Sequence, residues 1–177
     1  MKKILVIAVI LNSFFSYSQR EVNYNFTVNF TFTHNENFGE YDAYLQETDW
    51  SFFAYKSFLL RNGLEVELSR LISVGINLGL DWHPDLDVLA MPYYLDTKIA
   101  ISEVDNDKFY VSGGIGKLLK ISNAFEKGNY FKIGLGYHIA TEKSNAFILN
   151  LDFHQKDFTE FNHGKLNSLS LGFGMLF

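Results

Sequence analysis

The last ten residues of the chain, SLSLGFGMLF at Ser168–Phe177, alternate between large apolar side chains and small or polar ones. Side chains two residues apart lie on the same face of a β-strand, so such a segment separates an apolar environment from a polar one. The apolar face carries Leu169, Leu171, Phe173, Met175 and Phe177, and the other face carries Ser168, Ser170, Gly172 and Gly174. The pattern predicts an amphipathic strand.

The same alternation recurs upstream and gives eight such segments of roughly ten residues each, the length that a tilted strand needs to cross a bilayer. The segments are 26–33, 60–68, 74–82, 89–99, 109–116, 131–139, 147–154 and 169–177. Short links near 69–71, 102–107 and 141–144 alternate with generally longer ones at 34–49, 83–87, 122–129 and 157–165. Short turns at one end and longer loops at the other predict an antiparallel up-and-down β-barrel that spans a membrane.

The non-apolar faces of these segments carry a set of ionisable residues. The set is Arg61, Glu65, Glu67, Asp81, Asp96, Lys98, Lys132, His138, Asp152 and His154. In a soluble sandwich these side chains would face water, whereas in a membrane barrel they would point into the lumen and pair there. Candidate pairs are Arg61 with Glu65 or Asp96, and Lys98 or Lys132 with Asp152. The alternation alone favours neither environment.

Composition excludes several classes of protein. The 177 residues contain no Cys, which rules out disulfides, thiolate metal sites and cysteine nucleophiles. The formal net charge is −5, without a basic stripe, which argues against nucleic-acid binding. No apolar run reaches about 18 residues, which rules out a helical membrane protein.

The first residues have the pattern of a secretory signal peptide. Lys2 and Lys3 precede an apolar core at Ile4–Leu11, and small residues at Ser16 and Ser18 suit cleavage before Gln19. We therefore expect a signal peptide at 1–18 and a barrel domain at 19–177. The mature chain would lie outside the cytoplasm.

The last eight residues decide between the two environments. Ser170, Gly172, Met175 and the final Phe177 resemble the C-terminal signal by which outer-membrane barrels are recognised for assembly. With the signal peptide and the eight segments, this predicts the outer membrane as the location. The expected partners are the barrel assembly machinery, outer-membrane lipid and lipopolysaccharide. A soluble secreted β-sandwich or a lipocalin-like barrel remains the alternative.

Beyond this signal, 58–177 resembles the small outer-membrane β-barrel proteins common in Bacteroidetes, with a distant similarity to the outer membrane protein A and X barrels. The motifs that carry the resemblance are Arg61–Glu65 (RNGLE), Gly75–Gly79 (GINLG), Pro92–Asp96 (PYYLD), Gly134–Tyr137 (GLGY) and Gly172–Phe177 (GFGMLF). The resemblance implies an eight-stranded barrel in a Gram-negative outer membrane. The function of these proteins is mostly unassigned, and no catalytic residues come with the resemblance.

An eight-stranded barrel is just wide enough for its own side chains, so we expect a polar lumen that is plugged. The predicted role is structural or one of surface interaction, without catalysis or cofactor. The runner-up is a narrow pore or a small-ligand barrel. Lipid A 3-O-deacylases carry a His-x-Ser motif on the penultimate strand, but His154-x-Lys156 lacks the serine here. The five His are too scattered for a metal site, although His138 and His154 could meet in the lumen.

Three further features carry expectations. The link 34–49 holds Glu36, Glu40, Asp42, Glu47 and Asp49 and no Lys or Arg, so it could bind cations or a cationic partner. Pro92 lies inside a strand, where we expect a bulge or a shifted strand boundary. The segment 41–60 is either a loop followed by a strand or a short rim helix.

Aromatic residues are expected to form girdles at the two membrane interfaces. Trp50, Trp82, Tyr94 and Tyr130 would lie near the outer rim, and Tyr24, Tyr110 and Phe177 near the inner rim.

Overall fold

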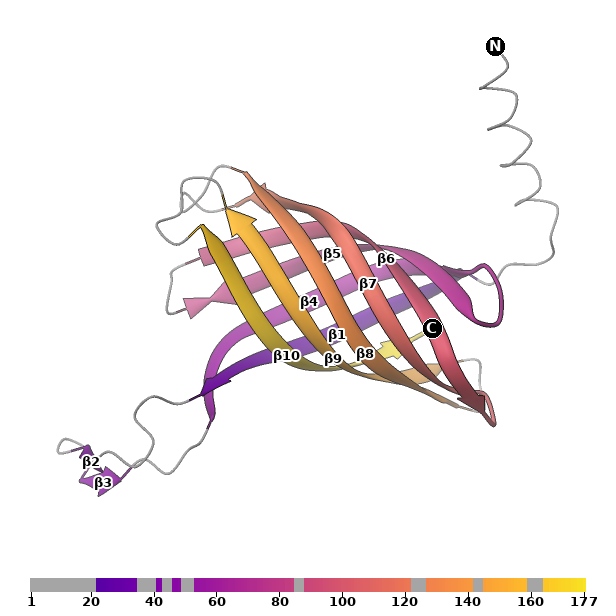
Figure 1. Cartoon of the computed structure of the whole chain (residues 1–177), viewed down its shortest axis with the longest axis horizontal. Coiled ribbons are helices and arrows are strands. Elements are labelled where there is room, and N and C mark those ends of the chain that lie inside the picture. Colours follow the sequence, from indigo (N-terminus) through magenta and orange to yellow (C-terminus); the bar gives the residue numbers. More distant parts are fainter. Residues whose placement is uncertain are drawn as a thin grey trace, which may run out of the picture.

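The computed structural model describes residues 22–34, 41–42, 46–48, 53–84, 88–121, 127–141, 145–158 and 164–177. They form one closed barrel and a separate two-stranded ladder (Figure 1). The predicted signal peptide at 1–18, its cleavage site before Gln19, Trp50 and most of 34–49 lie outside the described residues.

Eight strands form the barrel, and each pairs antiparallel with its neighbours. They are β1 (Val22–His34), β4 (Phe53–Glu67), β5 (Ile72–His83), β6 (Val88–Val104), β7 (Asp107–Lys120), β8 (Gly128–Ala140), β9 (Ala146–Phe158) and β10 (Lys165–Leu176). The last strand pairs with both β9 and β1, which closes the sheet. The predicted eight-stranded antiparallel barrel is confirmed.

Between β1 and β4, two short strands, β2 (Tyr41–Asp42) and β3 (Glu47–Thr48), pair with each other. The strand β4 begins at Phe53. Of the two interpretations of 41–60, the described residues therefore fit the loop followed by a strand.

The strands are staggered around the barrel. A row of paired residues starts at Phe32 on β1 and returns to the same strand at Val22, ten residues away. Between them the row passes through Leu169, Phe153, Ile133, Gly113, Thr97, Val74 and Val66. A stagger of this size goes with strands tilted by roughly 35–45° to the barrel axis.

The connections fall at two ends. The loop end carries the connections 35–52, 84–87, 121–127 and 159–164, and the turn end carries those at 68–71, 105–106 and 141–145. At the turn end, Val104 pairs with Asp107, and Asp105 and Asn106 both have positive φ angles of 52° and 72°. Two such residues form the tight turn that matches the twist of a hairpin. The predicted link at 102–107 is therefore shorter than expected.

The seam between the first and last strands extends to the final residue. The backbone N–H of Tyr24 donates to the carbonyl of Phe177 at 2.9 Å, and the N–H of Phe177 donates back to Tyr24 at 2.9 Å. The two rings lie 6.2 Å apart. Backbone pairing therefore continues past the end of β10.

The wall of the barrel is apolar outside and polar inside. Outward side chains such as Ile76, Ile115 and Leu171 are 67%, 66% and 56% exposed, whereas Asp81 and His154 inside are fully buried. A soluble sandwich or lipocalin-like barrel buries its apolar faces. This arrangement is the reverse, so the fold contradicts that alternative. No helix among the described residues is long and apolar enough to cross a membrane.

Pro92 causes no bulge, contrary to the prediction. On one side it pairs in register with Leu118 of β7. On the other side, pairing with β5 stops at Tyr93 and resumes at Ala90 without a shift in register. Gly79 opposes the gap, and a Cβ there would lie 2.9 Å from the Pro92 ring. The missing side chain thus makes room for the ring, and the sheet loses pairing rather than gaining a residue.

Candidate functional site: the charged interior

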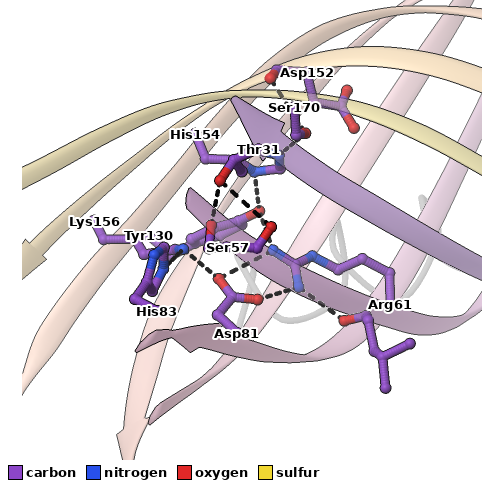
Figure 2. A network of polar contacts seen from close by, with 11 residues as sticks. Thr31, Ser57, Arg61, Asp81, His83, Tyr130, Asp152, His154, Lys156 and Ser170 are labelled. Carbon is purple, nitrogen blue, oxygen red and sulfur yellow. Dashed lines mark hydrogen bonds and ion pairs between the residues drawn. The ribbon is translucent and has the colours of Figure 1, made fainter. Parts of the chain in front are cut away.

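The interior of the barrel holds a network of polar contacts in which Asp81 on β5 binds two cations (Figure 2). Arg61 on β4 donates to both carboxylate oxygens, with Nη2 at 3.1 Å from Oδ2. Lys156 on β9 lies 2.6 Å from Oδ2. All three side chains are almost fully buried. One carboxylate therefore pairs with two cations in a dry environment, where paired charges are tolerated and unpaired ones are not.

Two further contacts fix these cations. The Lys156 ammonium lies 2.6 Å from Nε2 of His83, which can accept a hydrogen bond from it. Arg61 Nη1 also donates to the Leu60 carbonyl at 2.8 Å. A Cβ on Gly79 would lie 2.5 Å from that nitrogen, so the glycine also makes room for the guanidinium.

A chain of hydrogen bonds leads from Arg61 towards the middle of the barrel. Arg61 Nη2 donates to the Tyr130 hydroxyl at 3.2 Å, and that hydroxyl lies 2.6 Å from Nδ1 of His154. His154 Nε2 lies 2.7 Å from Ser170 Oγ, which in turn donates to the Asp152 carbonyl at 3.4 Å. The single proton of the Ser170 hydroxyl goes to the Asp152 carbonyl, so His154 Nε2 donates to Ser170, and His154 Nδ1 is left to accept from the Tyr130 hydroxyl.

The middle of the interior is organised around Lys132 on β8. Its ammonium lies 3.3 Å from Asp96 and 3.7 Å from Asp152. Asn150 Nδ2 donates to the second Asp152 oxygen at 2.6 Å. Of the predicted pairs, that of Lys132 with Asp152 is present. Arg61 instead pairs with Asp81, because Arg61 lies opposite Gly79 of β5, two residues from Asp81 along that strand.

Nearer the turn end, two more ion pairs line the interior. Lys98 pairs with Glu65, which also accepts from Ser73 at 2.5 Å. Lys108 lies 3.0 Å from Glu67. The ion pairs among the described interior residues thus join five cations with five carboxylates, so their formal charges balance. They are Arg61, Lys98, Lys108, Lys132 and Lys156 with Glu65, Glu67, Asp81, Asp96 and Asp152.

All ten residues of the predicted polar set lie on the inner face. Arg61, Glu65, Asp81, Asp96, Lys132, Asp152 and His154 are buried, and Glu67, Lys98 and His138 are half-buried. The two histidines do not meet, which corrects that expectation: His154 pairs in register with Lys132, whereas His138 pairs with Ile148. No cluster of three metal-ligating side chains occurs in the described ranges.

Sequence reasoning missed several inward residues. The predicted segments leave Lys156 just beyond 147–154 and His83 in the link 83–87, and the prediction assigns three tyrosines to the aromatic girdles. Tyr94, Tyr110 and Tyr130 are instead buried inside. Their positions have the same parity as Asp96, Ser112 and Lys132, so extending the alternation by one step would have found them. Tyr24, Trp82 and Phe177 do face outward and are exposed.

The four residues of the predicted assembly signal divide between the faces. Ser170 and Gly172 point inward and are buried, whereas Phe177 is exposed and Met175 is partly exposed. This is the alternation expected of a closing strand. Their role in assembly stays a prediction.

Apolar clusters and small cavities complete the interior. One cluster contains Val88, Ala90, Tyr94, Leu118, Tyr130 and Phe158, and the other contains Tyr110, Ala146, Ile148 and Leu176. A cavity of about 20 Å³ lies near Asp96, Lys132 and Asp152, and one of about 40 Å³ lies near Glu65 and Lys108. A water molecule needs roughly 10–15 Å³ on this measure, so each cavity has room for one or a few waters.

Comparison with known proteins concerns the fold. No family model matches the chain, and no curated protein matches it. A solved structure from work on the de novo design of transmembrane β-barrels is similar, with a TM-score of 0.54 over 90% of this chain and 97% of that one. The chain has the fold of a transmembrane β-barrel. The sequences are 8% identical, so the likeness concerns the fold alone, and the resemblance to the Bacteroidetes barrels stays a prediction.

Proposed function

We propose that this protein is an integral outer-membrane β-barrel with a plugged polar lumen and a structural or surface-interaction role, without catalysis or cofactor. The observation that carries the proposal is the inside-out distribution of side chains. An apolar wall around a polar interior is stable only where the wall meets lipid, because exposed apolar surface of this extent is unfavourable in water. The sequence pattern at 1–18 supports the outer membrane as the location.

The charge balance of the interior supports a plugged lumen. Asp81 and Arg61 connect neighbouring strands, and Lys156 reaches them from across the barrel. The two described interior cavities are no larger than about 40 Å³ and 20 Å³. A hydrated ion would need to break several buried ion pairs to pass, which is costly.

The direction of the hydrogen bonds supports a non-catalytic interior. Ser170 and His154 lie 2.7 Å apart, a spacing that hydrolases use to activate a serine. Here, however, His154 donates to Ser170 rather than accepting its proton. Ser170 is also 1% exposed, so no acyl group can approach it.

A narrow pore is the second candidate, and one observation favours it. The two interior cavities share Lys98, Tyr110 and Ile148 in their linings, so they lie next to each other in the lumen. Between the middle cavity and the loop end lie the Arg61–Asp81–Lys156 contacts and the cluster that contains Phe158. These contacts and this cluster fill the lumen on the loop-end side of the cavity, which favours a closed lumen over a pore.

Two measurements test the proposal. Outer-membrane fractionation and electrophoresis in SDS, with and without boiling, should give a membrane-embedded band that changes mobility on boiling. A soluble protein without a shift would contradict membrane insertion. Purified protein in planar bilayers should show little or no conductance, and large stable channels would contradict the plugged lumen and support the pore.

A further inference from the structure

A groove of about 560 Å³ runs along the outer wall over strands β6–β10. Its lining is mostly apolar and includes Gly113, Phe131, Ile133, Leu135, Leu151 and Phe153. Gly113 faces outward, and a Cβ added to it would meet nothing within 4 Å. The groove exists because this position lacks a side chain between bulky neighbours. Its volume lies within the roughly 300–1,000 Å³ of sites that bind small organic molecules.

Polar side chains border this groove towards the loop end. Lys117 lies four residues beyond Gly113 on the same outward face of β7, and it is exposed. It pairs in register with Asn129, two residues from Phe131 on β8, and Gln155 of β9 pairs with Phe131 itself. Residues two apart along a strand are about 6.6 Å apart, so an amine and two amides lie just above the apolar lining.

The charge around this border is predominantly positive. Lys165 and Asn167 face outward on β10, and both are exposed. One carboxylate, Asp157, is half-exposed and pairs in register with Asn129 and Lys165. Within the described part of the chain, neither Lys117 nor Lys165 has an ion-pair partner. Their charges are therefore available to a ligand.

The opposite side of the barrel differs at the same level. There the outward side chains near the loop end are Phe32, Tyr55 and Trp82, all exposed. Lys56 on β4 is exposed too, but it already takes part in a contact of its own. The combination of an apolar groove with an unpaired amine belongs to one side of the wall.

We propose that this surface binds an anionic membrane lipid, with an acyl chain in the groove at Gly113 and the headgroup phosphate at Lys117, Asn129 and Gln155. The inference rests on the proposed membrane insertion. An ammonium and two amide donors match phosphate oxygens. A lysine near the membrane boundary can extend its amine to the headgroups while its methylenes stay in the apolar layer. A single acyl chain bound in the groove covers the apolar lining, which would otherwise contact the mobile acyl chains of the bilayer.

Tryptophan quenching by brominated lipids tests this proposal. One reporter is Phe131→Trp in a chain that also carries Trp50→Phe and Trp82→Phe. The second reporter is the native Trp82 in a Trp50→Phe chain, because Trp82 faces outward on β5, away from the groove. Each is placed in phosphatidylcholine vesicles that contain increasing amounts of brominated phosphatidylglycerol or brominated phosphatidylcholine.

At the Phe131→Trp reporter, the brominated phosphatidylglycerol should reach half-maximal quenching at about threefold to fivefold lower mole fraction than brominated phosphatidylcholine. The two lipids should quench Trp82 equally. Adding Lys117→Gln should abolish the preference, and high salt should weaken it. The matched change Lys56→Gln, on the opposite side, should leave it unchanged. Gly113→Leu should reduce it by filling the groove.

The outcomes separate the two proposals. Equal quenching by both lipids at both reporters would overturn the lipid site while leaving membrane insertion intact. A preference that survives Lys117→Gln or Gly113→Leu would also overturn the site. If brominated lipid quenched neither reporter, membrane insertion itself would be contradicted.

Discussion

The Lys156 ammonium and the Asp81 carboxylate lie 2.6 Å apart, although their strands face each other across the barrel. In the closed order of eight strands, β9 and β5 are four places apart. Arg61 on β4 and Tyr130 on β8 are related in the same way and lie 3.2 Å apart. These contacts tie opposite walls together, so the interior acts as a cross-linked core rather than as a lining.

Replacing Asp81 by Asn should be strongly destabilising. It leaves the two buried cations Arg61 and Lys156 without their carboxylate, and breaking a buried ion pair in this way typically costs about 3–5 kcal/mol. The free energy of unfolding, measured by urea titration of the vesicle-inserted protein, should fall by this order. A matched control is Glu103→Gln, which removes an exposed carboxylate and should have little effect.

The same contact predicts an ordering among three variants. Lys156→Met removes one of two cations and leaves Asp81 paired with Arg61, so it should cost less than Asp81→Asn. In the double variant, Lys156→Met removes the ammonium that Asp81→Asn would leave without its carboxylate. The double variant should therefore cost less than the sum of the two single costs. Additive costs would show that Lys156 and Asp81 do not interact energetically.

The interior shows where the alternation of the sequence was sufficient and where it was not. The parity of Asp152 and His154 placed both inside, and both are buried. The same parity applies to Lys156, but a charged residue next to a predicted loop gives no sign that the strand continues. The sequence therefore suggested three basic residues against five acidic ones, whereas Lys156 and Lys108 complete the balance. Pair identity could not be predicted, because it depends on the stagger of the strands and on contacts across the barrel.

Glycines on β7 provide a test of close approach. A Cβ on Gly116 would lie 2.0 Å from the Tyr93 carbonyl oxygen and 2.5 Å from the Tyr94 Cβ, so the backbone would have to move. Gly116→Ala should therefore cost about 1–3 kcal/mol of unfolding free energy. Gly113→Ala, three residues away, meets open space and should be neutral or stabilising by up to about 1 kcal/mol. Equal effects would mean that the register between β6 and β7 differs from the one described.

Neighbouring residues on β10 test which face meets lipid. Leu171 is 56% exposed on the outer wall, so Leu171→Arg should cost about 2–4 kcal/mol in vesicles, where arginine would lie in the hydrocarbon layer. Ser170→Arg would crowd His154 inside and should prevent closure in detergent as well as in vesicles. The measurement is the fraction that migrates as folded barrel on unboiled gels after refolding in each medium. If neither Leu171→Arg nor Ser170→Arg changed the folded fraction, the assignment of one face of β10 to lipid and the other to the lumen would be wrong.

The role of Phe177 in assembly can be separated from its role in stability. Its ring lies 6.2 Å from that of Tyr24, and the ring of Phe173 lies 6.0 Å from that of Phe30, at similar interplanar angles of 30° and 28°. Phe177→Ala and Phe173→Ala should therefore each remove an aromatic contact worth about 0.5–1.5 kcal/mol in the purified barrel. If Phe177 is also recognised by the assembly machinery, Phe177→Ala should lower the amount of folded protein in the outer membrane several-fold more than Phe173→Ala. Equal amounts of the two variants in the membrane would show that Phe177 contributes its contact with Tyr24 but is not recognised by the assembly machinery.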